Sequence, residues 1–306
     1  MAQPAGRHVA VIGFGTVGVG WTALFLANGH DVTVHDPAVA DLAELESKLA
    51  PCLESLRRLG RDGTGRLALA GSAEAAAAEA GFIQENAPER IELKVDLLRR
   101  LDLAAPEGAI VASSTSSLLW SELTAGCAKA GRVIVAHPFN PPHLVPLVEL
   151  YGSDAGCLDA AQAFYAGLGM RPVRLQKEMR GHIANRLSSA LYREAVHLVE
   201  EGVASVEEID QALRDGPGLR WAVVGAHLAY HLGGGQGGIR HYLDHLGPSQ
   251  ERRWQDLGQP RLTPELKAKL VDGVLAEAGG RSIAELEAER DAALVALRLA
   301  RAEAGR

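Results

Sequence analysis

The chain has 306 residues, 47% of them hydrophobic and 23% charged, which is typical of a globular protein long enough for two domains. Its formal net charge of −7 argues against nucleic acid as a partner, because no basic stretch is available to neutralise phosphates. No apolar run approaches the ~18 residues that a membrane span requires, and the first residues do not resemble a signal peptide. The three cysteines are widely spaced, which indicates reduced thiols rather than disulfides. Together these features favour a cytoplasmic protein without membrane contact.

The first predicted elements are a strand, a glycine turn, a helix and a second strand, which together span 9–36. In the turn, Gly13 permits the tight bend, Gly15 the close approach of the backbone to a pyrophosphate, and Gly18 the packing of helix against strand. The unpaired N–H groups of the helix N-terminus favour that anion. The expected binding residues of this turn are Gly13, Phe14, Gly15, Thr16, Val17 and Gly18.

Asp36 ends the second strand at the distance of about 20 residues that a dinucleotide-binding fingerprint requires. Its carboxylate can accept hydrogen bonds from the ribose hydroxyls of the adenosine half, and it repels a 2′-phosphate. The segment therefore predicts a site for NAD rather than NADP.

Strands and helices alternate along the chain as far as residue 175. The expected strands are 67–70, 82–84, 110–112, 133–136, 147–150 and 173–175, and the expected helices are 42–59, 72–80 and 91–103. This alternation predicts a Rossmann-type α/β fold, doubly wound, with a mainly parallel sheet. Asp36, Glu89, Ser116 and His137 fall at or just past the carboxyl ends of strands, where such sheets bind ligands.

From Gly181 onward the pattern is helical, with a long helix to Gly202 and a final helix over 283–302. We therefore expect an NAD-binding domain over 1–180 and an all-α domain over 181–306 that binds substrate and forms a dimer. The final helix carries four leucines that one small domain does not fully bury, which favours a homodimer. They are Leu286, Leu294, Leu297 and Leu299.

The chain resembles the 3-hydroxyacyl-CoA dehydrogenase superfamily along nearly its whole length. The resemblance lies in the glycine fingerprint, STSSL at 114–118, HPFNPP at 137–142, LVEL at 147–150 and GHIANRL at 181–187. It implies catalytic roles for Ser116, His137, Glu149 and Asn185. It also implies that Glu89, Lys94 and Ser114 line the nicotinamide half of the cofactor site.

Elementary chemistry assigns a role to each of the four catalytic candidates. Oxidation of a secondary alcohol needs a base for the hydroxyl proton, and an imidazole suits this task, which assigns the proton to His137. Glu149 would stabilise the imidazolium and fix its tautomer. Ser116 and Asn185 would donate hydrogen bonds to the substrate oxygen. Taken singly, each residue also has a structural interpretation, as a turn residue, a strand-end histidine, an ion-pair partner or a helix cap.

Within the superfamily, the chain is most similar to the branch that contains the L-carnitine dehydrogenases, the L-gulonate 3-dehydrogenases and lambda-crystallin. FIQENAPERIELK at 82–94, GPGLRWA at 216–222 and the histidine- and glycine-rich stretch at 227–248 carry this similarity. It implies NAD-dependent oxidation of a small 3-hydroxy acid with a free carboxylate. Two alternatives stay open: a 3-hydroxyacyl-CoA dehydrogenase, and an NAD-binding structural or sensory protein of the crystallin type.

Charge supports the small acid, because the segment 41–66 contains five acids and five bases and offers little to a polyanionic CoA. Arg220 is a candidate for pairing with a carboxylate, and the neighbouring Trp221 for holding a cationic head group. An ordinary helix-end arginine and a core tryptophan are the alternative. Four histidines sit in two pairs spaced four apart, but pocket or surface roles explain them, and we expect no metal. They are His227, His231, His241 and His245.

Overall fold

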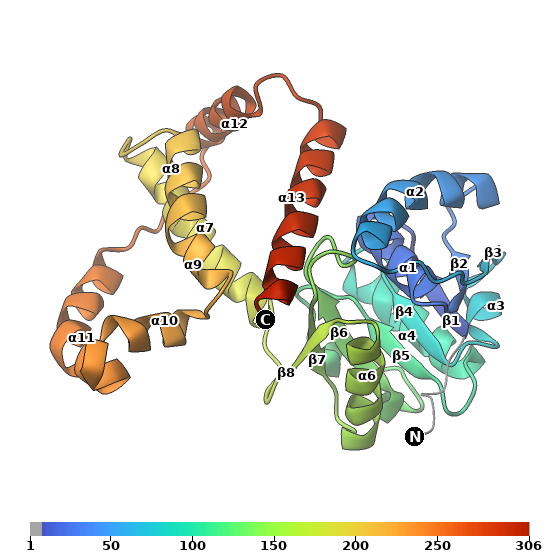
Figure 1. The fold of residues 1–306 in the computed structure, drawn as a ribbon. Coiled ribbons are helices and arrows are strands. Elements are labelled where there is room, and N and C mark those ends of the chain that lie inside the picture. The colour runs from blue at the N-terminus through green and yellow to red at the C-terminus, as the bar shows by residue number, and fades with distance from the viewer. Residues whose placement is uncertain (1–7, 306) are drawn as a thin grey trace. The chain divides into compact units, whose positions relative to one another are not determined.

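An eight-stranded sheet organises the first part of the computed structural model, which describes residues 8–305 (Figure 1). The strand order is β3-β2-β1-β4-β5-β6-β7-β8. The strands are β1 (His8–Ile12), β2 (Asp31–His35), β3 (Leu67–Leu69), β4 (Phe82–Glu85), β5 (Ile110–Ser113), β6 (Val133–Pro138), β7 (Leu147–Tyr151) and β8 (Arg171–Arg174). The predictions that concern residues 1–7, such as the missing signal peptide, lie outside the described residues.

All neighbouring strands run parallel except β6 and β7, which are antiparallel. The strand order changes direction between β1 and β4, so a crevice opens at their carboxyl ends, where doubly wound sheets bind dinucleotides. This confirms the predicted Rossmann-type α/β fold. The antiparallel pair aligns His137 of β6 directly opposite Glu149 of β7.

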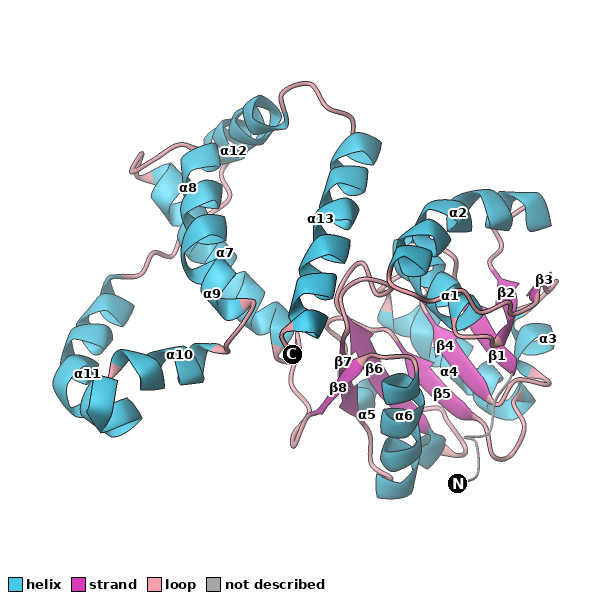
Figure 2. Cartoon of the chain, viewed as in Figure 1, coloured by secondary structure: helices cyan, strands magenta, loops and turns pink. Residues whose placement is uncertain are grey.

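Helices cover both faces of the sheet (Figure 2). One face packs against α1 (Thr16–Ala27), α2 (Leu42–Arg58) and α6 (Ala155–Gly167). The other packs against α3 (Ala73–Ala77), α4 (Ile91–Ala104) and α5 (Trp120–Leu123), and a short 3₁₀ turn (Ala130–Arg132) precedes β6. Full burial of these apolar faces stabilises the layers by roughly 25 cal/mol for each Å² removed from water.

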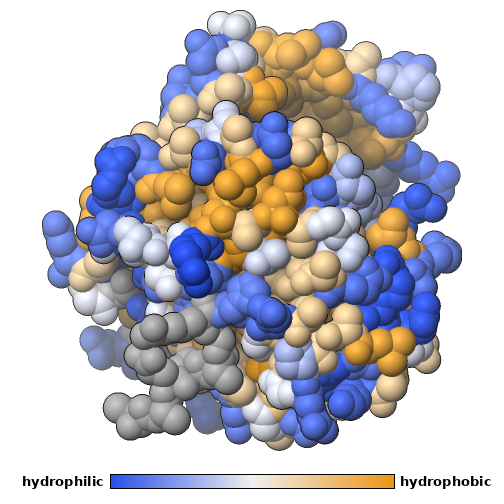
Figure 3. Space-filling view, turned by 90° about the vertical axis from the view of Figure 1, so that its right-hand side faces the viewer, coloured by the Kyte–Doolittle hydropathy of each residue, from blue (hydrophilic) through white to orange (hydrophobic). Residues whose placement is uncertain are grey.

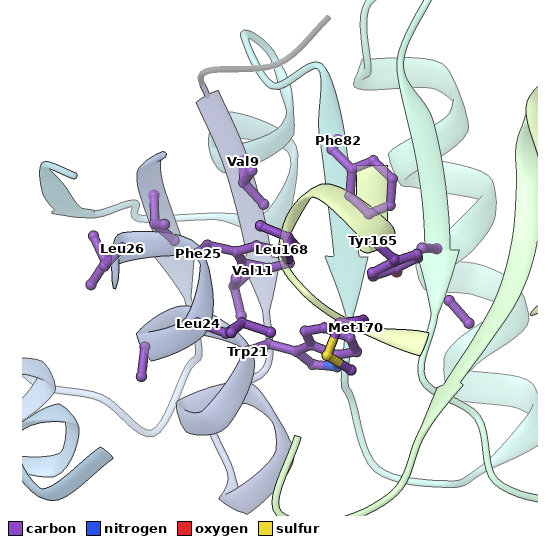
Figure 4. Close-up of a cluster of buried hydrophobic side chains, with 14 of the residues drawn as sticks. Val9, Val11, Trp21, Leu24, Phe25, Leu26, Phe82, Tyr165, Leu168 and Met170 are labelled. Carbon is purple, nitrogen blue, oxygen red and sulfur yellow. The ribbon is translucent and has the colours of Figure 1, made fainter. Parts of the chain in front are cut away.

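Aromatic side chains fill the core between β1, α1 and α6 (Figure 4). Trp21 and Phe25 of α1 stack with their ring centroids 5.6 Å apart, and Phe82 stacks on Phe164 at 4.1 Å. Trp21 and Phe25 are fully buried. This packing fixes the start of α1 against the sheet, and therefore the position of the glycine turn.

Three details of the sheet domain differ from the expectation. The last strand covers Arg171–Arg174 rather than 173–175, and its Pro172 is tolerated because β8 is an edge strand. The helix α3 ends at Ala77 rather than Ala80. Helix α6 was not predicted, although Asp154 caps it by accepting a hydrogen bond from the Cys157 amide at 2.7 Å.

The described residues form two compact units: 8–186 with 291–298, and 187–290 with 299–305. The second unit consists of helices and short helical turns. They are α7 (Ala184–Glu200, which begins in the first unit), α8 (Val206–Leu213), a π-helical turn (Arg214–Gly218), α9 (Leu219–Trp221), α10 (Ala226–Gly233), a 3₁₀ turn (Gly235–Gly237), α11 (Gly238–Asp256), α12 (Pro264–Ala278) and α13 (Ile283–Glu303, shared between the units).

The all-α character of the second part is as predicted. The first unit extends to Arg186, past the expected boundary at 180. The physical reason is that the Ile183 and Ala184 amides donate hydrogen bonds to Glu149 of β7. Each helix within 8–305 is too short or too polar to cross a membrane.

Large hydrophobic side chains remain exposed, and most of them lie in the second unit. On α10 and α11, Leu232 is 63% exposed, Leu243 58% and Trp254 61%. Of the four leucines of the final helix, Leu297 and Leu299 are exposed, and Leu286 and Leu294 are half-buried. Figure 3 shows one face of the molecule, on which hydrophobic residues also gather between hydrophilic ones.

Candidate active site

The glycine turn after β1 has the geometry that a dinucleotide needs. Gly13 has a φ of +91°, and a Cβ there would lie 2.7 Å from the backbone oxygen of Asn86. A Cβ on Gly18 would collide with the carbonyl oxygen of Gly13. At Gly15, by contrast, a Cβ would meet no atom within 4 Å, so the backbone at the N-terminus of α1 is open to a ligand. Phe14, Thr16 and Val17 lie in the same turn.

Asp36 follows β2 beside this turn. Its Oδ2 accepts a hydrogen bond from the Phe14 amide at 2.6 Å, and its Oδ1 accepts one from the Ala38 amide at 2.8 Å. Each oxygen keeps a further lone pair for a ribose hydroxyl. Asp36 lines a cavity of about 560 Å³, which extends from Gly13 to Ala87. These features fit the adenosine half of NAD.

A second cavity, of about 390 Å³, contains most of the predicted chemistry. It is lined by Val17, Asn86, Ala87, Glu89, Lys94, Ser114, Ser116, His137, Pro138, Phe139, Asn140 and Asn185. Ala87 lines both cavities, so the two adjoin at the residues that follow β4. The arrangement fits a dinucleotide whose nicotinamide end reaches His137.

His137 and Glu149 form a buried pair. His137 Nδ1 donates to Glu149 Oε2 at 2.8 Å, and Glu149 Oε1 accepts from the Ile183 and Ala184 amides at 2.8 and 3.1 Å. Burial acts to raise the pKa of Glu149, but the hydrogen bonds from His137, Ile183 and Ala184 outweigh it and hold that pKa below its ordinary value. The carboxylate is therefore charged at neutral pH, and it holds the tautomer with a proton on Nδ1.

The other ring nitrogen, His137 Nε2, lies 3.4 Å from Asn185 Nδ2. The same amide nitrogen donates to the Ser116 carbonyl at 3.3 Å. Asn185 lies in the first turn of α7, as predicted, and belongs to the same compact unit as the sheet. The structure thus brings His137, Glu149, Ser116 and Asn185 together at one end of the sheet.

Glu89 organises the hydroxyl-rich turn after β5. Its Oε1 accepts from Thr115 Oγ1 at 2.7 Å, from the Ser116 and Ser117 amides at 2.8 Å each, and from Ser116 Oγ at 3.2 Å. Burial acts to raise the pKa of Glu89, but the hydrogen bonds from Thr115 and the turn, with the charge of Lys94, hold it below its ordinary value.

Lys94 lies beneath this turn and is 1% exposed. Its Nζ donates to both oxygens of the buried Glu85, at 2.7 and 3.0 Å, and lies 3.7 Å from Glu89 Oε2. The sequence interpretation missed Glu85, the buried partner of Lys94. A signal was present, because Lys94 lies on the apolar stripe of α4 with Ile91, Leu98 and Leu101, where a lysine needs a buried acid.

Ser114 connects the cavity to the core. Its Oγ donates to Asn86 Oδ1 at 2.7 Å and accepts from Gln84 Nε2 at 2.9 Å and from Trp21 Nε1 at 3.2 Å. These bonds hold the cavity wall between β4 and β5 in one geometry.

Arg220 and Trp221 lie on α9 of the second unit and are not among the residues that line this cavity. Trp221 is 38% exposed. The histidine-rich segment has local contacts: His231 Nδ1 accepts from the Ile239 amide at 3.1 Å, and the His241 and His245 rings stack 5.4 Å apart. Within 8–305, the one cluster with metal-ligand spacing consists of His197, Glu200 and Glu201, outside that segment.

Comparison with protein families and relatives shows what the chain as a whole is similar to. The NAD binding domain of 3-hydroxyacyl-CoA dehydrogenase matches residues 8–179, and the C-terminal domain of that family matches 181–275. L-carnitine dehydrogenase from Nocardiopsis dassonvillei is 45% identical over 297 residues, which cover 95% of this chain and 90% of that protein. The enzyme of the same name from Streptomyces griseus is 46% identical, with 94% and 88% covered.

Solved structures of dehydrogenases have a similar fold. The NAD+-dependent 5-formyl-3-hydroxy-2-methylpyridine 4-carboxylic acid 5-dehydrogenase superimposes with a TM-score of 0.81 at 29% identity, over 95% of this chain and 97% of that one. (S)-3-hydroxybutyryl-CoA dehydrogenase from Ralstonia eutropha gives a TM-score of 0.60 at 29% identity, over 70% and 78%.

Proposed function

This chain belongs to the 3-hydroxyacyl-CoA dehydrogenase family, and we propose that it oxidises the 3-hydroxyl of a small hydroxy acid with a free carboxylate, such as L-carnitine, to the 3-oxo acid. The observation that carries this proposal is the buried His137–Glu149 pair, with its second ring nitrogen beside the cavity of the NAD-binding domain. The identity of about 45% to L-carnitine dehydrogenases over most of the chain supports the substrate class.

The proposed mechanism assigns one step to each residue. Glu149 keeps the proton on Nδ1 of His137, so Nε2 carries a lone pair and takes the proton of the substrate hydroxyl. The carboxylate then stabilises the imidazolium. When bound, NAD supplies the acceptor for the hydride that leaves C3. Asn185 donates a hydrogen bond from its side-chain amide to the substrate oxygen. The Ser116 hydroxyl, which donates to Glu89 in this structure, turns to donate to the substrate oxygen instead.

Charge favours the free acid over the CoA thioester. Around α2, Lys48 pairs with Glu44 at 2.7 Å, and Arg66 pairs with Asp31 at the same distance. Arg57 pairs with Glu54, and Arg61 donates to the Leu168 carbonyl. These bases offer little free charge to the phosphates of CoA.

We also propose a homodimer, because the second unit exposes large side chains on α10, α11 and α13. Exposed apolar side chains of this kind are typical of protein contacts, and a two-fold dimer is the commonest arrangement.

A substrate panel with a matched variant tests the function. We expect NADH production from L-carnitine or another 3-hydroxy acid, and little from 3-hydroxybutyryl-CoA. His137→Gln removes the base and keeps a polar side chain, so turnover should fall by at least ~10²-fold, while the affinity for NAD changes little. Turnover of CoA esters alone would favour the acyl-CoA alternative. NAD binding without turnover of any panel member would favour the structural or sensory protein.

A further inference from the structure

His182 is a buried histidine that the proposed reaction does not use. It is 4% exposed, and its ring lies against that of His137, with the centroids 4.9 Å apart and the planes at 42°. Its φ is +48°, the one positive φ of a non-glycine residue within 8–305. A non-glycine residue in this region is uncommon, and such conformations cluster at functional sites.

The ring of His182 joins two segments that carry site residues. Its Nε2 donates to the Thr115 carbonyl at 3.1 Å, and Thr115 Oγ1 donates to Glu89. The residues that follow His182 bond to Glu149 through their amides, and Asn185 bonds to the Ser116 carbonyl. His182 therefore lies where the turn at 113–117 meets the segment at 181–185.

We propose that His182 is a positioning residue: its neutral ring ties the 113–117 turn to the 181–185 segment, so that Ser116 and Asn185 keep their places beside His137, and the positive charge of the reaction stays on His137. This inference rests on the proposed role of His137 as the base. It adds to that role a residue that touches the base rather than the substrate.

The charges around His182 support a neutral ring. Burial lowers the pKa of His182, and the neighbouring His137 lowers it further, whereas the Thr115 carbonyl and the carboxylates of Glu149 and Glu89 oppose this change. The net direction is downward, so His182 takes up a proton only at a lower pH than an ordinary histidine. A proton on His182 would place a second positive charge beside His137 and oppose the imidazolium that the reaction forms.

Two variants separate the ring from its hydrogen bond. His182→Phe keeps an aromatic ring against His137 and removes the donor to Thr115, whereas His182→Gln keeps a donor that does not titrate. With L-carnitine and NAD, we expect His182→Phe to lower kcat roughly ten-fold with little change in NAD affinity. The kcat of His182→Gln should stay close to the native value. A His182→Phe variant that folds and keeps the native kcat overturns the proposal.

Nuclear magnetic resonance of ¹⁵N-histidine protein provides a test without substrate. In the native protein, we expect His182 to be neutral at pH 7 with its proton on Nε2, and the signals of the neighbouring His137 ring to shift when His182 takes up its proton at lower pH. In His182→Gln this shift should be absent. A His182 that is protonated at pH 7, or an unchanged shift of the His137 signals in the Gln variant, overturns the proposal even if the Phe variant does not fold.

His137→Gln separates this inference from the proposed function. Native turnover that survives His137→Gln, or the absence of turnover with L-carnitine and the rest of the panel, refutes the proposed function. Loss of turnover in that variant, together with native behaviour of both His182 variants, refutes only the role of His182.

Discussion

At the scale of single residues, we predict that Asp36 selects between the two nicotinamide cofactors. Its carboxylate is fixed by the Phe14 and Ala38 amides and lines the cavity that fits adenosine. A 2′-phosphate would face this negative charge, so NAD should be preferred over NADP, and Asp36→Ser should narrow the difference in kcat/KM about ten-fold or more. Asp31→Ser, at the other end of β2, is the control and should leave the preference unchanged. Equal kcat/KM with both cofactors in the native protein would contradict the assignment.

Arg220 tests the nature of the substrate. The carboxylate of a small hydroxy acid must be paired when it leaves water, because burying it alone costs several kcal/mol. Arg220 is exposed on α9 and does not line the cavity at His137, so its role as this partner stays a prediction from the sequence. If Arg220 binds the carboxylate, Arg220→Met should raise KM for L-carnitine roughly ten- to a hundred-fold, as expected for a charged hydrogen bond worth about 1.5 to 3 kcal/mol.

The same variant should leave the turnover of any thioester substrate nearly unchanged, since a thioester has no carboxylate at that end. Arg214→Met, which removes another exposed arginine of the second unit, is the control. An unchanged KM for the free acid in Arg220→Met would show that another group binds the carboxylate.

Sequence alone was sufficient to propose His137 and Glu149, but not their geometry. They lie twelve positions apart in the sequence, and they face each other because β6 and β7 pair antiparallel in one register. The spacing of a motif contains no information on that register. Two further residues near the site could not be predicted: Glu85, which binds Lys94, and His182, which lies against His137. Neither has a motif of its own, and both are recognised only by their burial and by the side chains that they contact.

At the scale of elements, the turn between β1 and α1 combines a packing role with a binding role. Gly18→Ala should destabilise the fold, because its Cβ would collide with the Gly13 carbonyl, and overpacking of this kind typically costs 1–3 kcal/mol. Gly15→Ala should leave the melting temperature nearly unchanged, because its Cβ would meet no protein atom, but it should weaken NAD binding. Thermal unfolding and NADH fluorescence measure the two effects. Equal melting temperatures of the two variants would contradict this division.

The elements that were predicted well carry strong local signals. Helix α2 begins at Leu42, directly after Asp41, whose side chain accepts a hydrogen bond from the Glu44 amide at 3.0 Å, as expected for an N-cap. In contrast, α6 was missed because the stretch at 155–167 is mostly alanine and glycine with few charged residues, and its pattern is weak. Its Phe164 and Tyr165 are nevertheless buried in the core, so tertiary packing decides its structure.

At the scale of the whole molecule, the order of elements was sufficient to predict a Rossmann-type domain followed by helices. The family models meet at residues 179 and 181, next to the expected boundary, whereas the compact first unit extends to Arg186 because hydrogen bonds tie the chain to the sheet there. Glu149 holds the segment after Gly181 to the first unit, and residues 291–298 of α13 also belong to that unit. Contacts between distant segments of this kind leave no local pattern in the sequence.

The last prediction concerns assembly. Leu232 and Leu243, on α10 and α11, are more than half exposed, and burying such side chains against a second copy would stabilise a dimer by about 1.5 to 3 kcal/mol each. Light scattering at micromolar concentration should therefore give twice the 32.4 kDa of one chain. Leu232→Glu with Leu243→Glu should yield monomers, because a buried charge at the contact lacks a partner. Leu103→Glu, on α4 of the first unit, alters a leucine that is 67% exposed and should leave the dimer intact. A native protein that scatters as a monomer, or a double variant that stays dimeric, would rule out this surface as the contact.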